Sequence, residues 1–226
     1  DLHSFPTRRS SDLNLLAALV SDAALLADHA ATTLAESVLG LLIGCAVGFA
    51  FAVLMDRFEI VYLAFSPLIT VSQTVPTVAI APLLVLWLGY GLAPKVVLVV
   101  LTTFFPITVS LVSGFRSVDP DLIDLMRTMN ATSAQIFWQV KIPAAAEQFF
   151  SGLKISATYA IVGAVIAEWL GGFSGLGVYM TRVRKSFAYD RMFAVIALIS
   201  ALSLALMGAV SAIQRICMPW KRAERK

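Results

Sequence analysis

An uncharged run of 35 residues, from Ile60 to Pro94, constrains the fold of this chain more than any other sequence feature. A membrane-spanning helix needs about 20 predominantly apolar residues, so the run is too long for one straight crossing. Prolines, which break or kink helices, recur along it at Pro67, Pro76, Pro82 and Pro94. Broken helix is tolerated in a bilayer where it packs against protein or lines a cavity. We therefore expect one kinked crossing from about Ile60 to about Trp87, followed by a short re-entrant or external segment.

Four further apolar segments have the length of a crossing. They cover Thr33–Met55, Val96–Phe115, Leu153–Gly171 and Met192–Gln214. Hydrophobic residues make up 59% of the chain and charged residues 14%, whereas soluble domains are close to half apolar and a quarter charged. The sequence therefore predicts an all-α, polytopic bundle of transmembrane helices with about five crossings. No basic face indicates a nucleic-acid partner, and the widely separated Cys45 and Cys217 lack the spacing of metal ligands.

The first thirteen residues differ from the rest of the chain. They include the stretch FPTRRSSDL, which resembles translated sequencing-adapter DNA, and they lack the apolar core of a signal peptide. The alternative is a native polar arm. We expect residues 1–13 to be a non-native segment and residues 14–226 to form the membrane domain.

Lysine and arginine in short loops predict the orientation, because they are retained on the cytoplasmic side. The C-terminal tail is basic, with Lys221, Arg222, Arg225 and Lys226. A cytoplasmic tail and five crossings place Arg57 and the polar segment 116–147 in the cytoplasm as well. One loop conflicts with this orientation, since Arg182, Arg184, Lys185 and Arg191 then lie outside.

The segment at about 116–147 is the only long polar insertion between crossings, and its first half predicts a short amphipathic helix. Asp119 and Pro120 form a good helix start, because Asp caps free N–H groups and Pro suits the first turn. An apolar stripe follows at helical spacing, formed by Leu122, Leu125, Met126 and Met129. Asn130 tolerates the left-handed conformation that ends a helix.

The second half of the insertion predicts another short helix. Thr132 or Ser133 can cap it, it runs through Val140, and Pro143 stops it. Two short helices at an angle would protrude from the membrane and bind a partner. The alternative is an amphipathic hairpin lying on lipid headgroups. The spacing of the residues leaves both open.

The insertion resembles the EAA coupling loop of permease subunits in ATP-driven (ABC-type) importers. In that motif Asp124 stands at the Glu, Leu125 and Met126 at the two Ala, and Asn130 at the Gly, with Lys141 to Pro143 at the terminal apolar-Pro. The motif is degenerate, although Asn at the Gly position preserves the turn. The resemblance implies that the loop contacts an ATPase subunit. The residues assigned to this coupling are Leu122, Asp124, Leu125, Met126, Arg127, Met129, Asn130, Ala131 and Pro143.

The resemblance extends over residues 33–220, in order and spacing. It is carried by Ser72–Pro76, Ala81–Leu84, Gly152–Lys154, Ala167–Gly172 and Gly175–Gly177. The chain is similar to the branch of importer permeases for nitrate, sulfonate, taurine and thiamine precursors. Within that branch, the residues at Glu168–Gly171 and Arg182–Ser186 are most similar to those of hydroxymethylpyrimidine permeases. The family has six crossings, so the resemblance implies a type I importer permease fold with one N-terminal helix missing here.

The resemblance also implies the partners and the location. It predicts a multi-pass protein of the bacterial inner membrane, assembled with a second permease copy as a homodimer, an ATPase subunit, an extracytoplasmic solute-binding protein and membrane lipid. No phosphate-binding G-x-x-x-x-G-K-[ST] motif occurs. We therefore expect no enzymatic activity, no metal and no cofactor in this chain, with ATP and magnesium held by the ATPase.

Polar groups inside a membrane are costly and so are candidates for the translocation path. Gln73 and Thr74 lie beside Pro76, where the helix should break and expose backbone groups, and Glu168 ends an apolar crossing next to Trp169. The candidates are therefore Gln73, Thr74, Pro76, Glu168 and Trp169. For Gln73 the alternative is hydrogen bonding between helices. For Glu168 and Trp169 it is an interfacial carboxylate bonded to nearby backbone and an interfacial anchor.

Three glycines at four-residue spacing, Gly40, Gly44 and Gly48, allow close helix approach. They predict either packing within the chain or a dimer interface between permease copies.

Other functions fit less well. A sulfonate, taurine or nitrate importer would have the same fold. A passive channel has no need of a protruding hairpin. An intramembrane enzyme requires paired ionisable groups at membrane depth, and the sequence indicates only Glu168 there.

Overall fold

The computed structural model describes residues 22–219, which form helices and no strand. The expected non-native segment 1–13 and the basic C-terminal tail lie outside these residues. The elements are α2 (Ala23–Arg57), α3 (Glu59–Ser72), α4 (Thr77–Leu88), α5 (Leu92–Arg116), α6 (Pro120–Thr128), α7 (Ser133–Ile136), a π-helical turn (Phe137–Lys141), α8 (Ile142–Gly171), α9 (Leu176–Lys185) and α10 (Tyr189–Cys217). The expected all-α bundle is confirmed.

Within the described residues, four helical spans are long and apolar enough to cross a membrane, and a bent pair makes up to five. The bent pair is α3 and α4, which meet at 100°. The break falls where the sequence predicts it, because the residue before a proline is driven out of helical conformation and Pro76 directly precedes α4. Pro67 and Pro82 lie inside α3 and α4 without ending them.

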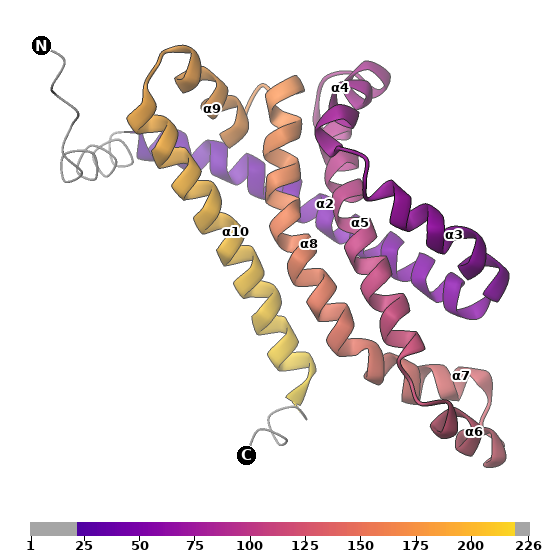
Figure 1. Ribbon diagram of the computed structural model, residues 1–226. Coiled ribbons are helices and arrows are strands. Elements are labelled where there is room, and N and C mark those ends of the chain that lie inside the picture. The colour runs from indigo at the N-terminus through magenta and orange to yellow at the C-terminus, as the bar shows by residue number, and fades with distance from the viewer. Residues whose placement is uncertain (1–21, 220–226) are drawn as a thin grey trace, which may run out of the picture.

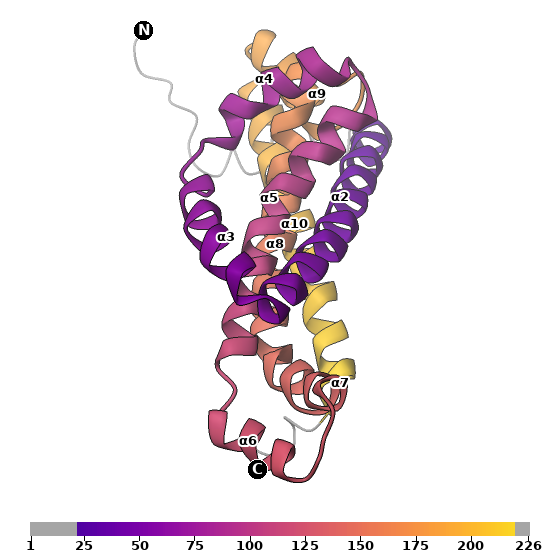
Figure 2. The same ribbon diagram turned by 90° about the vertical axis from the view of Figure 1, so that its right-hand side faces the viewer.

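Helices α5 and α8 pack together along the centre of the bundle, and α2 crosses them at a steep angle (Figures 1 and 2). The three spaced glycines of α2 face α5. A methyl group added to Gly44 would lie 2.1 Å from the hydroxyl oxygen of Thr103, and one on Gly40 would lie 2.4 Å from a methyl of Val99. The structure thus places these glycines in packing within the chain.

Helices α6 and α7 lie at one end of the bundle, and α4 and α9 lie at the other (Figure 2). The predicted start and end of α6 are confirmed. The side chain of Asp119 accepts from the N–H of Asp121 at 2.9 Å, Pro120 occupies the first turn, and Asn130 has a φ of 61°. The predicted cap at Thr132 is also confirmed, as a reciprocal capping box with Gln135.

The prediction that Pro143 stops the second short helix is wrong. The chain passes from α7 through the π-helical turn into α8 without leaving helical conformation, and the whole span covers Ser133–Gly171. Pro143 lies in the first turn of α8, where a missing N–H is tolerated. The wider π turn just before it also relieves the clash between a proline ring and the preceding turn. The helix that contains the fourth crossing therefore begins well before the predicted Leu153.

Candidate functional site: a pocket at the helix break, a protruding amphipathic helix and a buried polar cluster

The apolar stripe of α6 is exposed. Leu122, Leu125 and Met129 are 43%, 56% and 70% exposed, and Met126 is half-buried. Asp124 and Arg127 form an ion pair with each other at 3.0 Å, and their side chains are 69% and 68% exposed. A row of exposed apolar side chains rimmed by charge is typical of a protein or membrane contact. Asp124 and Arg127 therefore neutralise each other at the edge of the stripe.

A pocket of about 470 Å³ opens at the break between α3 and α4. We call it the break pocket. Three predicted path residues, Gln73, Thr74 and Pro76, line it, and α5 and α8 close it with Thr102, Phe105 and Tyr159, among others. The structure therefore brings these three sequence candidates together around one cavity.

The break pocket is uncharged, since none of its lining residues is acidic or basic, and it combines polar side chains with apolar ones such as Ile80 and Leu101. The hydroxyls of Thr74 and Thr102 donate to backbone carbonyls of Val71 and Val99, at 2.7 and 2.9 Å. The amide of Gln73 makes only a long bond of 3.4 Å, to the carbonyl of Ile69. A neutral solute with hydrogen-bonding groups and a flat apolar face suits such a lining better than an ion does.

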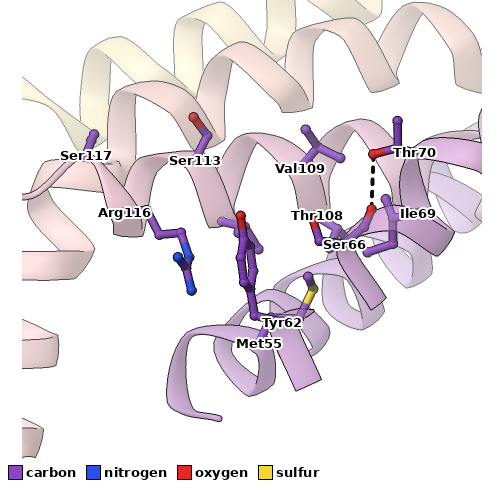
Figure 3. A pocket seen from close by; sticks show the side chains of 11 residues that line it. Met55, Tyr62, Ser66, Ile69, Thr70, Thr108, Val109, Ser113, Arg116 and Ser117 are labelled. Atoms are coloured by element: carbon purple, nitrogen blue, oxygen red, sulfur yellow. Dashed lines mark hydrogen bonds between the residues drawn. The ribbon is translucent and has the colours of Figure 1, made fainter. Parts of the chain in front are cut away.

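A second pocket, of about 460 Å³, lies between α3 and α5 nearer the α6 end (Figure 3). It is lined by Tyr62, Ser66, Thr70, Ser113 and Arg116, among others. The guanidinium of Arg116 lies 3.3 Å from the centre of the Tyr62 ring and pairs with Glu59 at 2.6 Å. Because Glu59 neutralises the arginine, this pocket presents no unpaired charge. The two pockets follow α3 in succession, from its start to its broken end.

Glu168 does not reach the break pocket. It is 1% exposed, and its carboxylate accepts from the hydroxyl of Thr33 at 2.7 Å and from the N–H of Gly177 at 2.6 Å. This carboxylate therefore satisfies one free N–H group in the first turn of α9. A methyl group on Gly175, whose φ is 119°, would lie 2.2 Å from the carboxyl carbon. The glycines after Glu168 thus allow α9 to approach it.

Glu168 belongs to a buried group that sequence reasoning missed. Lys95 pairs with Glu36 at 2.6 Å, with side chains 6% and 4% exposed, and Glu36 also lies close to Glu168. The imidazole Nδ1 of His29 accepts from the N–H of Gly175 at 2.9 Å. We call this group the polar clasp. Its members are His29, Thr33, Glu36, Lys95 and Glu168.

Glu168 is therefore not an isolated buried ionisable group, because Glu36 and Lys95 are buried beside it. Glu36 and Lys95 stand at the flanks of apolar segments in the sequence, and only the crossing of α2 over α5 brings them together. Trp169 is 44% exposed and lines a separate hollow with Tyr90 and Phe173. Neither Glu168 nor Trp169 lies in the break pocket with the other three candidates.

Comparison with known proteins relates the chain to transport proteins. Residues 40–219 match the family model described as "Binding-protein-dependent transport system inner membrane component". The chain is 37% identical over 196 residues to the formylaminopyrimidine transport permease protein of Halalkalibacterium halodurans, covering 87% of this chain and 78% of that protein. It is 39% identical over 188 residues to a probable ABC transporter permease protein of Haemophilus influenzae, covering 83% and 77%.

The fold is also similar to a solved structure. A chain of the methionine ABC transporter MetNI, in an inward-facing conformation, matches with a TM-score of 0.73 and 20% sequence identity. The match covers 85% of this chain and 95% of that chain.

Proposed function

Because the chain belongs to the family of binding-protein-dependent transport system inner membrane components and is thus a permease subunit of an ABC importer, we propose that α6 couples it to a separate ATPase. The observation that carries this proposal is the exposed apolar stripe of α6, which lies one turn before the continuous helical span Ser133–Gly171. A groove on the ATPase covers Leu122, Leu125 and Met129. ATP and magnesium reside on that partner, and two copies of the permease enclose the path.

This assignment fixes the orientation. The α6–α7 end faces the cytoplasm, since ATP is there, and α4 and α9 face the outside, where a solute-binding protein delivers its cargo. The C-terminus is cytoplasmic, and apolar outer faces of the bundle contact lipid. Movement of the ATPase pair displaces α6 and α7 and tilts α8, which opens the path to one side or the other.

The break pocket lies on the path that the solute takes. Irregular backbone at membrane depth exposes N–H and C=O groups to a cavity, and Gln73 and Thr74 add side-chain groups there. The uncharged lining supports a neutral pyrimidine-type solute, in keeping with the formylaminopyrimidine permease relative. A sulfonate, taurine or nitrate is the alternative, and an anion of that kind would favour a basic side chain in the pocket.

Co-purification tests the coupling proposal. The chain, tagged and co-expressed with the ATPase subunit encoded beside it, should form a stable complex in mild detergent. Changing Leu122 and Leu125 to Ser should abolish the complex, whereas Arg215→Gln, an exposed change on α10, should not. A folded, membrane-inserted chain that never binds the ATPase would refute the proposal.

Uptake assays test the path. Gln73→Ala should lower transport of an aminopyrimidine without lowering complex formation, because the break pocket lies far along α3 from α6. Stabilisation of the cognate binding protein by an aminopyrimidine, compared with taurine and nitrate, identifies the solute. Stabilisation by an anion alone would favour the alternative.

A further inference from the structure

Two ion pairs join the ends of the polar segment that holds α6 and α7 to the turn between α2 and α3. At the first end Arg116, the last residue of α5, pairs with Glu59 at 2.6 Å. At the other end Lys141, the last residue of the π-helical turn, donates to both carboxylate oxygens of Asp56, at 2.7 and 2.9 Å. Asp56 lies in the last turn of α2, and Glu59 is the first residue of α3. Both basic residues therefore converge on one corner of the chain.

The two pairs differ in their exposure to water. The side chains of Lys141 and Asp56 are 21% and 11% exposed, so salt screens this pair only weakly. The side chains of Arg116 and Glu59 are 38% and 63% exposed, and an exposed pair contributes little on its own. Arg116 has a second contact, because its guanidinium lies 3.3 Å from the centre of the Tyr62 ring (Figure 3). Since Glu59 and Tyr62 lie one turn apart on the helix, Arg116 holds the first turn of α3 by two contacts.

Other charged residues near the corner in the sequence do not replace these partners. Arg57 is exposed, and Asp119, the N-cap of α6, accepts from the N–H of Asp121. Among the residues that the structure describes, none of these three forms an ion pair. The corner is thus bound by one basic residue from each end of the polar segment.

Helix α3 is otherwise loosely attached to the bundle. It packs on α2 and stands apart from α5, with the second pocket between them (Figure 2). Within α3, which the structure describes in full, only Ile69 is buried, whereas Ile60, Leu63 and Val71 are 82%, 65% and 63% exposed. An element with few buried contacts moves relative to its neighbours at a low cost in free energy. The contacts of its first turn therefore determine which part of the molecule α3 follows.

The far end of α3 reaches the break pocket. The helix is continuous from Glu59 to Ser72 although it contains Pro67, and Gln73 and Thr74 follow it into the lining of the pocket. A continuous helix of 14 residues transmits a displacement of its first turn to its last turn. Whatever moves the corner between α2 and α3 therefore moves one wall of the break pocket.

We propose that the α2–α3 corner, formed by Asp56, Glu59 and Tyr62, carries the movement of α6 and α7 to α3 and so to the break pocket. Arg116 and Lys141 tie the corner to the moving segment, and all five are positioning residues that act through α3. The inference rests on the proposed function, which places the ATPase at α6 and the solute in the break pocket. The competing role is fold stability alone, but pairs with that role can lie anywhere on the bundle. These two pairs lie at both ends of the one segment that the ATPase displaces.

The test uses proteoliposomes that contain the permease with its ATPase, with ATP inside and the solute-binding protein outside. An aminopyrimidine, taurine and nitrate are the probes. Solute uptake and ATP hydrolysis are measured in one sample, and their ratio reports how well the movement reaches the path. Arg116→Gln should lower this ratio about five- to tenfold, which corresponds to the loss of an exposed ion pair and a cation–π contact. Tyr62→Leu, which removes only the ring contact, should lower it about two- to fivefold.

Further variants show whether the ion pairs are responsible. Exchanging the charges, Glu59→Arg with Arg116→Glu, rebuilds the first pair and should restore most of the ratio. Lys141→Gln, which breaks the second pair, should lower the ratio further when it is added to Arg116→Gln. The matched control is Arg57→Gln, at an exposed arginine of the same turn, and it should leave the ratio unchanged.

The outcomes separate the inference from the proposed function. An unchanged ratio in Arg116→Gln, and in its combination with Lys141→Gln, would overturn transmission through the α2–α3 corner and leave the permease role standing. Uptake and hydrolysis that fall in the same proportion, together with a lower Tm, would assign the pairs to fold stability and also overturn it. An unchanged permease that never binds the ATPase and transports none of the probes would instead overturn the proposed function.

Discussion

Removing one member of the Lys95–Glu36 pair should unfold this protein at a markedly lower temperature. The two side chains are 6% and 4% exposed and their charged atoms are 2.6 Å apart, so water does not reach the pair. In Lys95→Met the carboxylate of Glu36 stays buried without its counter-charge. Loss of one partner of a buried pair costs about 3–5 kcal/mol, whereas a surface pair contributes about 0–1 kcal/mol. For a chain of this size the buried-pair cost corresponds to a fall in Tm of roughly 6–20 °C.

The double variant Glu36→Gln with Lys95→Met provides the decisive comparison. It removes both charges and keeps the approximate volume, so its Tm should return most of the way to that of the unchanged protein. Heating in detergent followed by size-exclusion chromatography measures these values, and Lys185→Met, an exposed lysine, is the control. A Tm for Lys95→Met within about 2 °C of the control, or a double variant less stable than either single one, would refute the reasoning.

Three further predictions concern other parts of the molecule. Gly44→Ala should destabilise by about 1–3 kcal/mol in thermal unfolding, because its methyl would overlap the Thr103 hydroxyl, whereas Gly208→Ala, which meets nothing within 4 Å, should be neutral or stabilising. Replacing Asp124 and Arg127 by Ala should abolish uptake while Tm changes little, since an exposed pair of this spacing contributes about 0.2–0.5 kcal/mol; normal uptake would contradict the coupling role. Burial and a hydrogen bond to a carboxylate raise the pKa of Tyr179 to about 12, so the stability this phenol contributes is complete below about pH 10 and is lost as pH rises through 12. Alkaline unfolding followed by circular dichroism should show that loss in the unchanged protein and not in Tyr179→Phe.

Local features of the fold could be predicted from the sequence because their causes lie within a few residues. The cap at Asp119, the left-handed turn at Asn130 and the break before Pro76 each follow from the chemistry of one or two side chains. The failure at Pro143 is of the same local kind. A proline can end a helix or lie in the first turn of one. Which of the two occurs depends on the hydrogen bonding of the turn before it.

The polar clasp could not be predicted, because its contacts join residues far apart in the chain. Thr33 and Glu168 are separated by 135 positions, and Lys95 and Glu36 by 59. Each looks, in the sequence, like an isolated polar residue at the margin of an apolar segment. Only the crossing of α2 over α5 and the return of α9 bring them together. Part of the break pocket was easier to predict, since Gln73, Thr74 and Pro76 are neighbours in the sequence.

The π-helical turn at Phe137–Lys141 accommodates one extra residue between α7 and α8. A π turn holds one residue more than the α-helical turn it replaces, and each residue of an α-helix turns the chain by about 100°. Both turns complete one rotation, so deleting one residue within the π turn would restore an α-helical turn and leave the elements before it facing the same way relative to α8. In related chains, loss of a single residue here would therefore keep the exposed apolar stripe in the same direction, whereas loss of one from the α-helical turns of α8 would rotate it by about 100° about the axis of α8.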